Sequence, residues 1–323
     1  QRMMTMANLT KQQRKELAIH NRVEINRELK RRAAITLAQM PGPDQFWYFC
    51  KAINPSFYKD DRVYLKELCH ALQYFALEDE RQYFLLSLPP QHGKSYTVSL
   101  LDSFLFGVKH NFRIINVSYA QTVTEKLSNT VRSVVQNAVC TNDELSIVFS
   151  DIFPHTRFGK GPINEWYMDK SPVTSFKATS IGGQLTSFGG DIGIIDDPIK
   201  DHYIANNAVE KHKIYEWYKN TFRSRVNNGK TIIIMTRWAD DDLIGRIKTD
   251  FDLIGIRYSE FLRKAYDEET DTMLCEELYS KEQYNNNFLL AGEDLSIFLA
   301  NYQQQPISAR GKLYGSFDTY DPH

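Results

Sequence analysis

Residues 88–95 read LPPQHGKS, and this stretch decides the expected fold of the chain. It follows the apolar run QYFLLSL at 82–88 and precedes SYTVSLLDSFLFGV, a segment with helical character. Backbone N–H groups at the start of such a helix point toward bound phosphates. Strand, glycine-containing loop and helix together therefore favour a phosphate-binding loop over a chance Gly-Lys-Ser tripeptide.

Each residue of this loop has an expected role in binding a nucleotide. Lys94 would reach the β and γ phosphates, Ser95 would hold Mg²⁺, and Gly93 lets the backbone approach closely. The usual motif begins with a glycine five residues before Gly93, but Leu88 stands there and two prolines stiffen the loop instead. The other residues expected to contact the nucleotide are Pro90, Gln91, His92 and Tyr96.

A second motif, DIGIIDDP at 191–198, supplies the expected acids. An apolar run that ends in paired acids is typical of a buried parallel strand with carboxylates at its carboxyl edge, where ligands of open α/β sheets bind. Asp196 is expected to bind Mg²⁺, usually through water, and Asp197 to polarise the attacking water. The alternative is a strand followed by an Asp-Pro turn.

A third motif, TIIIMTRW at 231–238, predicts another buried strand with polar residues at its tip. In many ATPases that drive motion, a polar residue on the strand beside the acidic strand senses the γ-phosphate and links hydrolysis to movement. Thr236 is assigned this role and joins Lys94 and Asp197 as an expected catalytic residue. The alternative is a strand with a polar cap.

The three motifs, in this order and wording, resemble the ATPase domain of tailed-bacteriophage large terminase subunits. The phrase TRW followed by acids, and the late YQQ-P, are specific to that family. Composition and periodicity alone lead only to a nucleoside triphosphatase. The resemblance covers most of the chain and also rests on NVSYAQTVTEKLSNTVRS (116–133), TSIGGQLTSFGGDIGIIDDPIKD (179–201), WYKNTFRSRV (217–226), MTRWADDDLIGRI (235–247) and YQQQPISARGKLYGSF (302–317).

The resemblance implies an α/β P-loop NTPase of the RecA-like ASCE type, with a central, mostly parallel sheet flanked by helices. The expected extra strand lies between the phosphate-loop strand and the acidic strand. With ATP and Mg²⁺ as cofactors, the protein would translocate double-stranded DNA into a procapsid. The implied partners are the portal protein and the small terminase subunit. The resemblance also implies that the protein forms a homo-oligomeric ring on the portal and is a monomer in solution. The implied site of action is the host cell cytoplasm, at the procapsid portal vertex.

Two positions depart from the family pattern. Relatives often carry Arg where this chain has Gln91 and Phe188, and an Arg at either place would stabilise charge in the transition state. Many relatives also have Glu where this chain has Asp197. The remaining candidates for an arginine finger or sensor are Arg225, Arg223, Arg237 and Arg157.

Three segments are expected along the chain. Residues 1–58 would form an N-terminal helical segment and an aromatic connector beside the adenine, 59–248 the ATPase core, and 249–323 a lid or linker subdomain with a further strand at 251–261. The expected elements of the core are strands at 82–88, 113–118, 192–195 and 231–236, and a helix near 121–139.

The family normally continues into an RNase H-like nuclease that needs a cluster of metal-binding acids. Here GKLYGSF at 311–317 is followed by DTYDPH. An isolated motor domain without nuclease activity is therefore expected, with Asp318 and Asp321 solvated.

Composition agrees with one large α/β domain and a smaller subdomain. The chain has 323 residues, of which 42% are hydrophobic, and a net charge of −1, so DNA contact would need a local basic stripe. The four cysteines do not have the spacing of a metal site. The sequence also lacks an apolar run of 18 residues, which a membrane-spanning helix would need. Two alternatives stay open: a helicase-type translocase, and a non-hydrolysing DNA- or portal-binding module with a degenerate nucleotide site.

Overall fold

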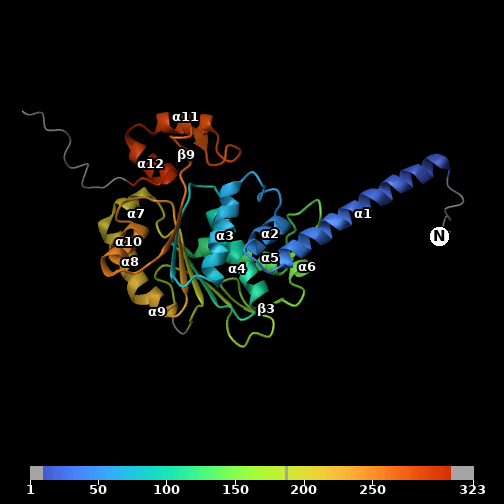
Figure 1. Ribbon diagram of the computed structural model, residues 1–323. Coiled ribbons are helices and arrows are strands. Elements are labelled where there is room, and N and C mark those ends of the chain that lie inside the picture. The colour runs from blue at the N-terminus through green and yellow to red at the C-terminus, as the bar shows by residue number, and fades with distance from the viewer. Residues whose placement is uncertain (1–9, 186–187, 307–323) are drawn as a thin grey trace, which may run out of the picture.

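A sheet of eight strands organises the described chain (Figure 1). The structure is a computed structural model, and it describes residues 10–185 and 188–306. The motif GKLYGSF and the acids Asp318 and Asp321 lie outside the described residues. Across the sheet the strands run β3 (Phe158–Lys160), β4 (Glu165–Met168), β5 (Phe176–Ser180), β2 (Ile114–Ser118), β6 (Ile192–Asp196), β7 (Lys230–Ile234), β1 (Tyr83–Ser87) and β8 (Ser259–Leu262).

The sheet is mostly parallel, which confirms the expected fold class. From β5 to β8 every neighbouring pair is parallel, while β3–β4 and β4–β5 are antiparallel. The apolar strands β1, β2 and β6 are buried along their whole length, as strands covered on both faces must be. Strand β7 lies between the phosphate-loop strand β1 and the acidic strand β6, so the extra strand is where it was expected.

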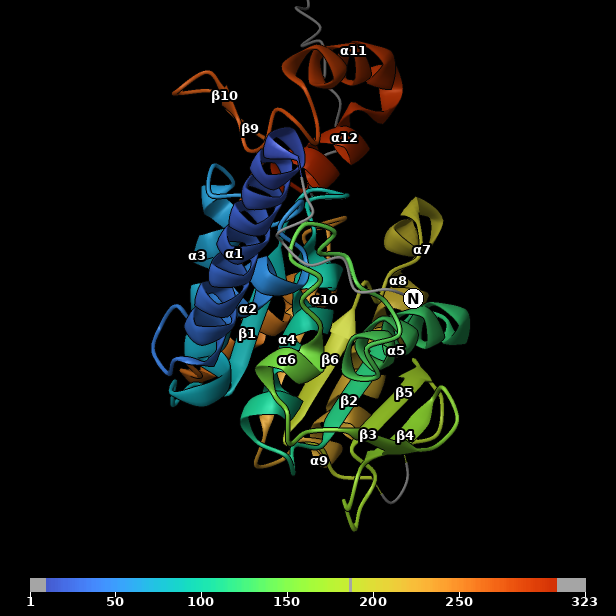
Figure 2. The ribbon, with the colours of Figure 1, turned by 90° about the vertical axis from the view of Figure 1, so that its right-hand side faces the viewer.

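Helices cover both faces of this sheet. One face packs against α2, α3, α4 and α5 through a core that includes Phe49, Leu68 and Phe104; Figure 2 shows α4 and α5 in front of β2 and β6. The other face packs against α8, the π-helix η2 and α10 through Phe222, Ile247 and others. The bounds of these helices are α2 Gln45–Ile53, α3 Val63–Leu77, α4 Lys94–Val108, α5 Gln121–Val135, α8 Ala208–Trp217, η2 Tyr218–Phe222 and α10 Leu243–Ile254.

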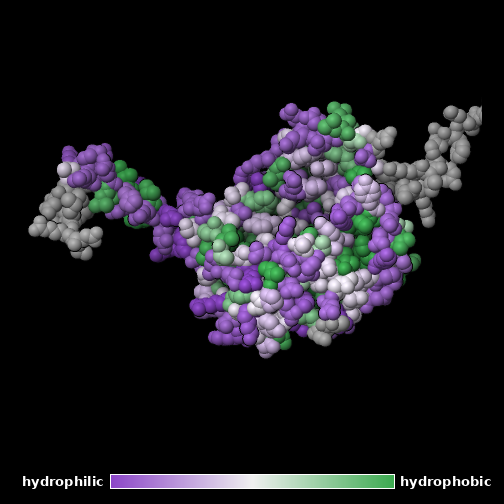
Figure 3. Space-filling view, turned by 180° about the vertical axis from the view of Figure 1, so that it is seen from behind, coloured by the Kyte–Doolittle hydropathy of each residue, from purple (hydrophilic) through white to green (hydrophobic). Residues whose placement is uncertain are grey.

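The first helix projects from this body. Helix α1 (Lys11–Gln39) begins with a capping box at Thr10, and Figure 1 shows its N-terminal part extending beyond the sheet and its covering helices. Its outer residues are exposed, and Figure 3 shows apolar patches among its polar ones. Contact with the body starts near Arg27, whose guanidinium donates to the carbonyl of Glu144 and the hydroxyl of Ser146.

The remaining elements are short or belong to a C-terminal subdomain. That subdomain has a small core of its own around Ala265, Tyr284 and Phe298. Among the described residues, no helix combines the length and apolar character needed to cross a bilayer. The bounds of these elements are α6 Phe149–Ile152, α7 His202–Asn206, α9 Arg223–Arg225, β9 Tyr266–Asp267, β10 Thr272–Met273, α11 Lys281–Ala291, the 3₁₀-helix η3 Gly292–Asp294 and α12 Leu295–Gln303.

The structure corrects several boundaries. The expected division between 248 and 249 falls inside α10, and β8 beyond it pairs with β1 in the main sheet, so the core extends to about residue 262. The expected strand at 251–261 is half helix, because Asp242 caps a helix that runs to Ile254 and only the last residues enter β8. The expected aromatic connector contains a helix, α2, most of whose residues are buried in the core.

Candidate functional site

The loop between β1 and α4 has the backbone conformation of an anion cradle. Gln91 and Gly93 both have positive φ, at 62° and 84°, and Gly93 precedes the first residue of α4. A Cβ at Gly93 would lie 2.5 Å from the ring of Phe57, so only glycine fits without displacing that ring. No side chain caps α4, which leaves the N–H groups of its first turn available to a bound phosphate.

Ser95 and Asp196 meet at the carboxyl edge of the sheet. The Ser95 hydroxyl donates to Oδ1 of Asp196 at 2.9 Å, across 101 positions of sequence. Burial, followed by the charge of Asp197, raises the pKa of Asp196 to about 7, against the opposing effects of Lys94 and Ser95. A hydroxyl and a buried carboxylate that lacks a strong cation partner form an oxygen donor set that suits Mg²⁺.

Lys94 and Asp197 form the second pair of the site. The Lys94 ammonium lies 3.6 Å from Oδ2 of Asp197, and the Lys94 side chain is only 9% exposed. Asp197 has a positive φ of 42° and its N–H donates to the carbonyl of Ile234. Because a non-glycine residue rarely adopts this conformation, the turn after β6 holds Asp197 at some cost in conformational strain.

A cavity of about 300 Å³ opens beside the loop. Phe57 and Tyr96 provide aromatic faces in it, with ring centroids 5.7 Å apart and planes at 88°. Asn54 donates to the Tyr96 hydroxyl at 3.1 Å and so fixes that ring. The residues that line the cavity are Phe57, Gln91, Gly93, Lys94, Ser95 and Tyr96.

Two of the loop residues expected to contact a nucleotide do not line this cavity. The His92 side chain is buried, and its Nδ1 lies 2.8 Å from the carbonyl oxygen of Pro90. Burial lowers the pKa of His92, which favours the neutral ring. The Tyr64 hydroxyl donates to the His92 carbonyl, so His92 and Pro90 shape the loop from behind.

The expected sensor residues follow β7, which ends at Ile234, two residues earlier than the sequence predicted. The backbone N–H of Thr236 donates to Oδ1 of Asp197 at 3.3 Å, which places Thr236 beside the paired acids. Arg237 instead turns inward, and its Nε donates to both oxygens of the fully buried Asp242. The backbone N–H of Arg237 donates to the side chain of Gln304, which follows α12.

None of the four arginines that were candidates for a finger contacts the phosphate-binding loop in this chain. Arg223 and Arg225 lie at the opposite edge of the sheet, where the Arg225 carbonyl accepts from Gly190, about 20 Å along β6 from Asp196. Arg157 precedes the edge strand β3. Phe188, at the other position where relatives carry Arg, packs against the core on the α10 face.

Sequence reasoning missed a buried polar group behind the site. Asp102 on α4 is fully buried, and neither of its carboxylate oxygens has a hydrogen-bond partner among the described residues. Burial raises its pKa well above the usual value, the neighbouring Asn116 side chain opposes that effect, and the charge of Asp196 adds to it. Ser118 on β2 lies opposite Asp196 in the strand register. The polar residues of the otherwise apolar IINVS strand were the available signal.

Comparison with solved structures identifies this fold. The HK97 bacteriophage large terminase superposes with a TM-score of 0.52 at 13% identity, over 75% of this chain and 50% of that one. The Thermus phage P74-26 large terminase ATPase domain gives a TM-score of 0.48 at 15% identity, over 74% and 93% of the two chains. No protein-family model and no curated protein matches the sequence.

The fold is therefore a RecA-like P-loop fold of the kind found in a phage large terminase, and the resemblance seen in the sequence is confirmed at the level of the fold. The chain spans about half the length of the HK97 large terminase that it matches.

Proposed function

We propose that this chain is the ATP-hydrolysing motor domain of a viral large terminase that translocates double-stranded DNA into a procapsid. The observation that carries the proposal is the convergence of Lys94 and Ser95 with Asp196 and Asp197 at one edge of the sheet. These residues come from two motifs about a hundred positions apart, and a degenerate site has no reason to keep all four in contact.

The residues divide the work of hydrolysis between them. Lys94 and the N–H groups of α4 would neutralise the phosphates of ATP, and Ser95 and Asp196 would hold Mg²⁺. Bound Mg²⁺ would supply charge neutralisation on the β and γ oxygens. When Lys94 turns to the phosphates it releases Asp197, whose carboxylate then accepts a hydrogen bond from the attacking water.

The bond changes are those of an in-line displacement. The water oxygen bonds to the γ-phosphorus while the bond from that phosphorus to the bridging oxygen of ADP breaks. ADP and inorganic phosphate leave, and the proton of the water passes to Asp197 or solvent. Phe57 and Tyr96 would hold the adenine or ribose in the cavity beside the loop.

Thr236 and Arg237 supply a route from the site to the C-terminal subdomain. Thr236 touches Asp197 through its N–H, so a change at the γ-phosphate alters the turn after β7. The next residue, Arg237, is bonded to Gln304 at the end of α12. This connection supports coupling between hydrolysis and movement of the subdomain.

We infer that charge in the transition state is completed by a neighbouring subunit. Gln91 carries no charge. None of the four candidate arginines contacts the phosphate-binding loop of its own chain: Arg157, Arg223, Arg225 and Arg237. A ring assembled on the portal protein would bring an arginine from the next copy to the site. The proposed setting is the host cytoplasm at the portal vertex, with the small terminase subunit as a further partner and a monomer in solution.

The second candidate is a non-hydrolysing DNA- or portal-binding module, which is favoured by the finding that none of the four candidate arginines contacts the phosphate-binding loop. Steady-state ATPase measurements at rising protein concentration, with and without duplex DNA, separate the two. We expect slow turnover that rises more than linearly with concentration or with DNA. Tight ATP binding with no turnover under any of these conditions would favour the binding module, and a fast rate strictly linear in concentration would contradict the role of a neighbour. A helicase-type translocase would instead separate duplex strands.

A further inference from the structure

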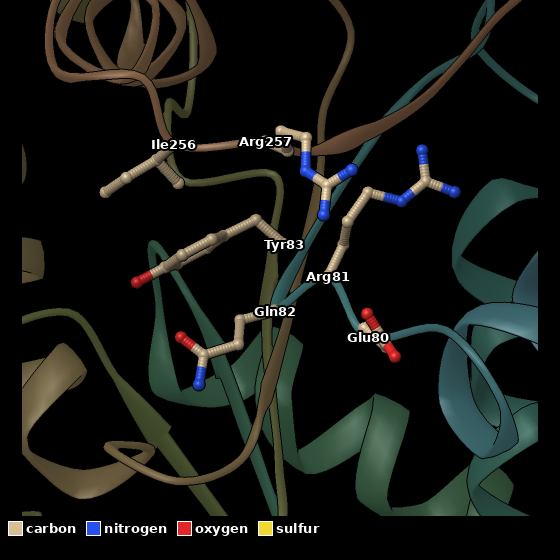
Figure 4. Close-up of a pocket in the computed structure, with 6 residues that line it drawn as sticks. All are labelled: Glu80, Arg81, Gln82, Tyr83, Ile256 and Arg257. Atoms are coloured by element: carbon tan, nitrogen blue, oxygen red, sulfur yellow. The ribbon is translucent and has the colours of Figure 1, made fainter.

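A second cavity lies at the amino edge of the sheet, opposite the phosphate-binding loop. It has a volume of about 230 Å³, is open to solvent, and lies between the segment before β1 and the connection from α10 to β8. Figure 4 shows the residues that line it: Glu80, Arg81, Gln82, Tyr83, Ile256 and Arg257. With about 17 Å of β1 between the two edges, this cavity is separate from the nucleotide site.

The guanidinium groups of Arg81 and Arg257 both lie at this cavity, and no carboxylate is bonded to both of them. The Nε of Arg81 donates to both oxygens of Asp79 at 2.9 Å, but its terminal nitrogens have no acceptor among the described residues. Arg257 is exposed and makes no hydrogen bond or ion pair within the described part of the chain. Figure 4 shows the Glu80 carboxylate turned away from both guanidinium groups.

The acid that binds Arg81 is already fully engaged. Although burial opposes it, hydrogen bonds from Arg81 and Ser259 bring the pKa of Asp79 down to about 2, so this carboxylate is ionised and fully engaged. Asp79 therefore neutralises Arg81, while Glu80, the acid that lines the cavity, makes no ion pair with Arg81 or Arg257. Two like charges at one cavity repel each other, and an anion between them removes that repulsion.

The strand order extends the positive charge into a row. Lys230 begins β7, Arg81 precedes β1 and Arg257 precedes β8, and these three strands are neighbours spaced by about 4.8 Å. The Lys230 ammonium donates to the carbonyls of Phe75 and Asp79, which are neutral acceptors. Farther along the edge, Arg113 is paired with Asp191, so the row ends there.

We propose that Arg81 and Arg257 form a phosphate-binding site at the amino edge of the sheet. The guanidinium fork matches two phosphate oxygens, and Arg81 and Arg257 both line the same cavity. A row of cations one strand apart suits the repeating phosphates of a nucleic-acid backbone better than a single free phosphate. The site lies outside the nucleotide-binding machinery and operates without ATP hydrolysis.

Arg257 is the residue to change, because it is exposed and holds no other group in place, whereas Arg81 orders Asp79. Binding of a fluorescein-labelled DNA duplex is measured by anisotropy over a range of salt concentrations, in nucleotide-free protein. Arg257→Gln should weaken binding several-fold and reduce the slope of log K against log salt by about 0.9, the value for one phosphate contact. Arg257→Glu should weaken it further, and Arg257→Lys should restore most of it.

Lys126→Gln is the matched control, since Lys126 is an exposed cation on α5 and its removal changes net charge equally. A parallel arm compares the thermal shift caused by inorganic phosphate with that of chloride at equal ionic strength. A shift that is lost in Arg257→Gln, with DNA binding unaffected, assigns the site to free phosphate. If neither DNA nor phosphate distinguishes Arg257→Gln and Arg257→Glu from the control, the site is not a phosphate site. Basal ATP hydrolysis is expected to stay unchanged, so this outcome is independent of the proposed ATPase.

Discussion

Lys94 occupies a nearly dry position between two functional groups. Its side chain is 9% exposed, and its ammonium faces the carboxylate of Asp197 at 3.6 Å. The backbone N–H of Thr236 holds that carboxylate from the other side. A charge in such a place interacts strongly with an incoming phosphate, because little water competes for it.

Lys94→Ala is expected to abolish ATP hydrolysis and to weaken nucleotide binding by a few kcal/mol, the scale of a charge-assisted hydrogen bond in a partly dry site. Calorimetric titration of ATP and a phosphate-release assay measure the two effects. Lys126→Ala, which removes an exposed lysine from α5, is the control and should match the wild type. Wild-type turnover in folded Lys94→Ala would show that the loop does not bind phosphate.

Asp196 and Asp197 are neighbours with different surroundings, so replacing each with asparagine should affect ATP hydrolysis differently. Asp197→Asn is expected to keep ATP binding and slow turnover by orders of magnitude, because its side chain is 36% exposed and can accept a hydrogen bond from water once Lys94 turns to the phosphates. Asp196→Asn should chiefly shift the Mg²⁺ dependence of the rate, since Asp196 is buried against Ser95. Rates measured across Mg²⁺ concentrations test this, and equal losses of nucleotide affinity in both variants would contradict the division.

Asp102 leads to a pH prediction. Burial raises its pKa well above the usual value, so the folded chain keeps a proton that the unfolded chain releases above about pH 4. The free energy of unfolding should therefore fall as pH rises from about 4 toward the folded pKa, by up to about 1.4 kcal/mol per pH unit. Asn has no such proton, so Asp102→Asn should gain stability relative to wild type as pH rises.

Thermal melts over that pH range give the difference in Tm between Asp102→Asn and wild type. The exposed Asp61→Asn is the control and should give a nearly constant difference. Parallel curves for Asp102→Asn and wild type would mean that Asp102 is ionised in the folded protein.

At the scale of elements, one buried ion pair joins the turn after β7 to α10. Arg237 and Asp242 have side-chain exposures of 9% and 0%, and Asp242 also caps α10 by accepting from the N–H of Gly245. Its second oxygen accepts from the N–H of Trp238, which closes the turn. A single carboxylate thus orders both the turn that carries Thr236 and the start of a helix.

Asp242→Asn is expected to destabilise the fold by about 3–5 kcal/mol, because it leaves the Arg237 charge buried without a counterion. Urea unfolding followed by circular dichroism measures the change. Asp240→Asn, two residues away and exposed, should cost little and serves as the control. A loss below about 1 kcal/mol for Asp242→Asn would mean that the pair is not formed in solution.

At the scale of the whole molecule, α1 is the part least dependent on the rest. Its 29 residues span about 44 Å, and Ile19, Val23, Ile25 and Leu29 are each more than half exposed. Residues 11–32 contain eight Lys or Arg and three Glu, a composition that keeps a helix face solvated. Only from Arg27 onward does the helix contact the body, and Ala38 at its end is fully buried.

Removal of residues 1–26 is therefore expected to leave the Tm of the protein within about 2 °C of the full chain, because it exposes no core. Removal of residues 1–39 should lower it markedly, since Ala34, Ile35 and Ala38 pack against the main hydrophobic core. Thermal melts of both truncations make the comparison. A large loss from the shorter deletion would indicate that the outer helix packs against something in solution.

Much of the fold could be predicted because its signals are local. The strands β1, β2 and β6 are continuous apolar runs, and the acids and the Gly-Lys-Ser loop directly follow such runs. The predicted strand at 251–261 was wrong because two local signals compete there. The segment FDLIGIRYSEF contains residues that favour strands, but Asp242 caps a helix that continues to Ile254. The buried helix α2 was not predicted, because Pro41 and Pro43 stand just before it and the segment was assigned to an aromatic connector.

Sequence by itself determined which residues would meet at the carboxyl edge of the sheet, since the loop, the paired acids and the strand tip each lie in a few adjacent positions after an apolar run. Tertiary structure alone decided which groups are available. It buried Arg237 against Asp242, turned His92 away from the cavity, buried the Asp102 carboxylate beneath the site and placed Arg257 beside Arg81. The physical reason is that a side chain's charge state and freedom depend on neighbours brought together by strand order, and strand order is not written in any local stretch.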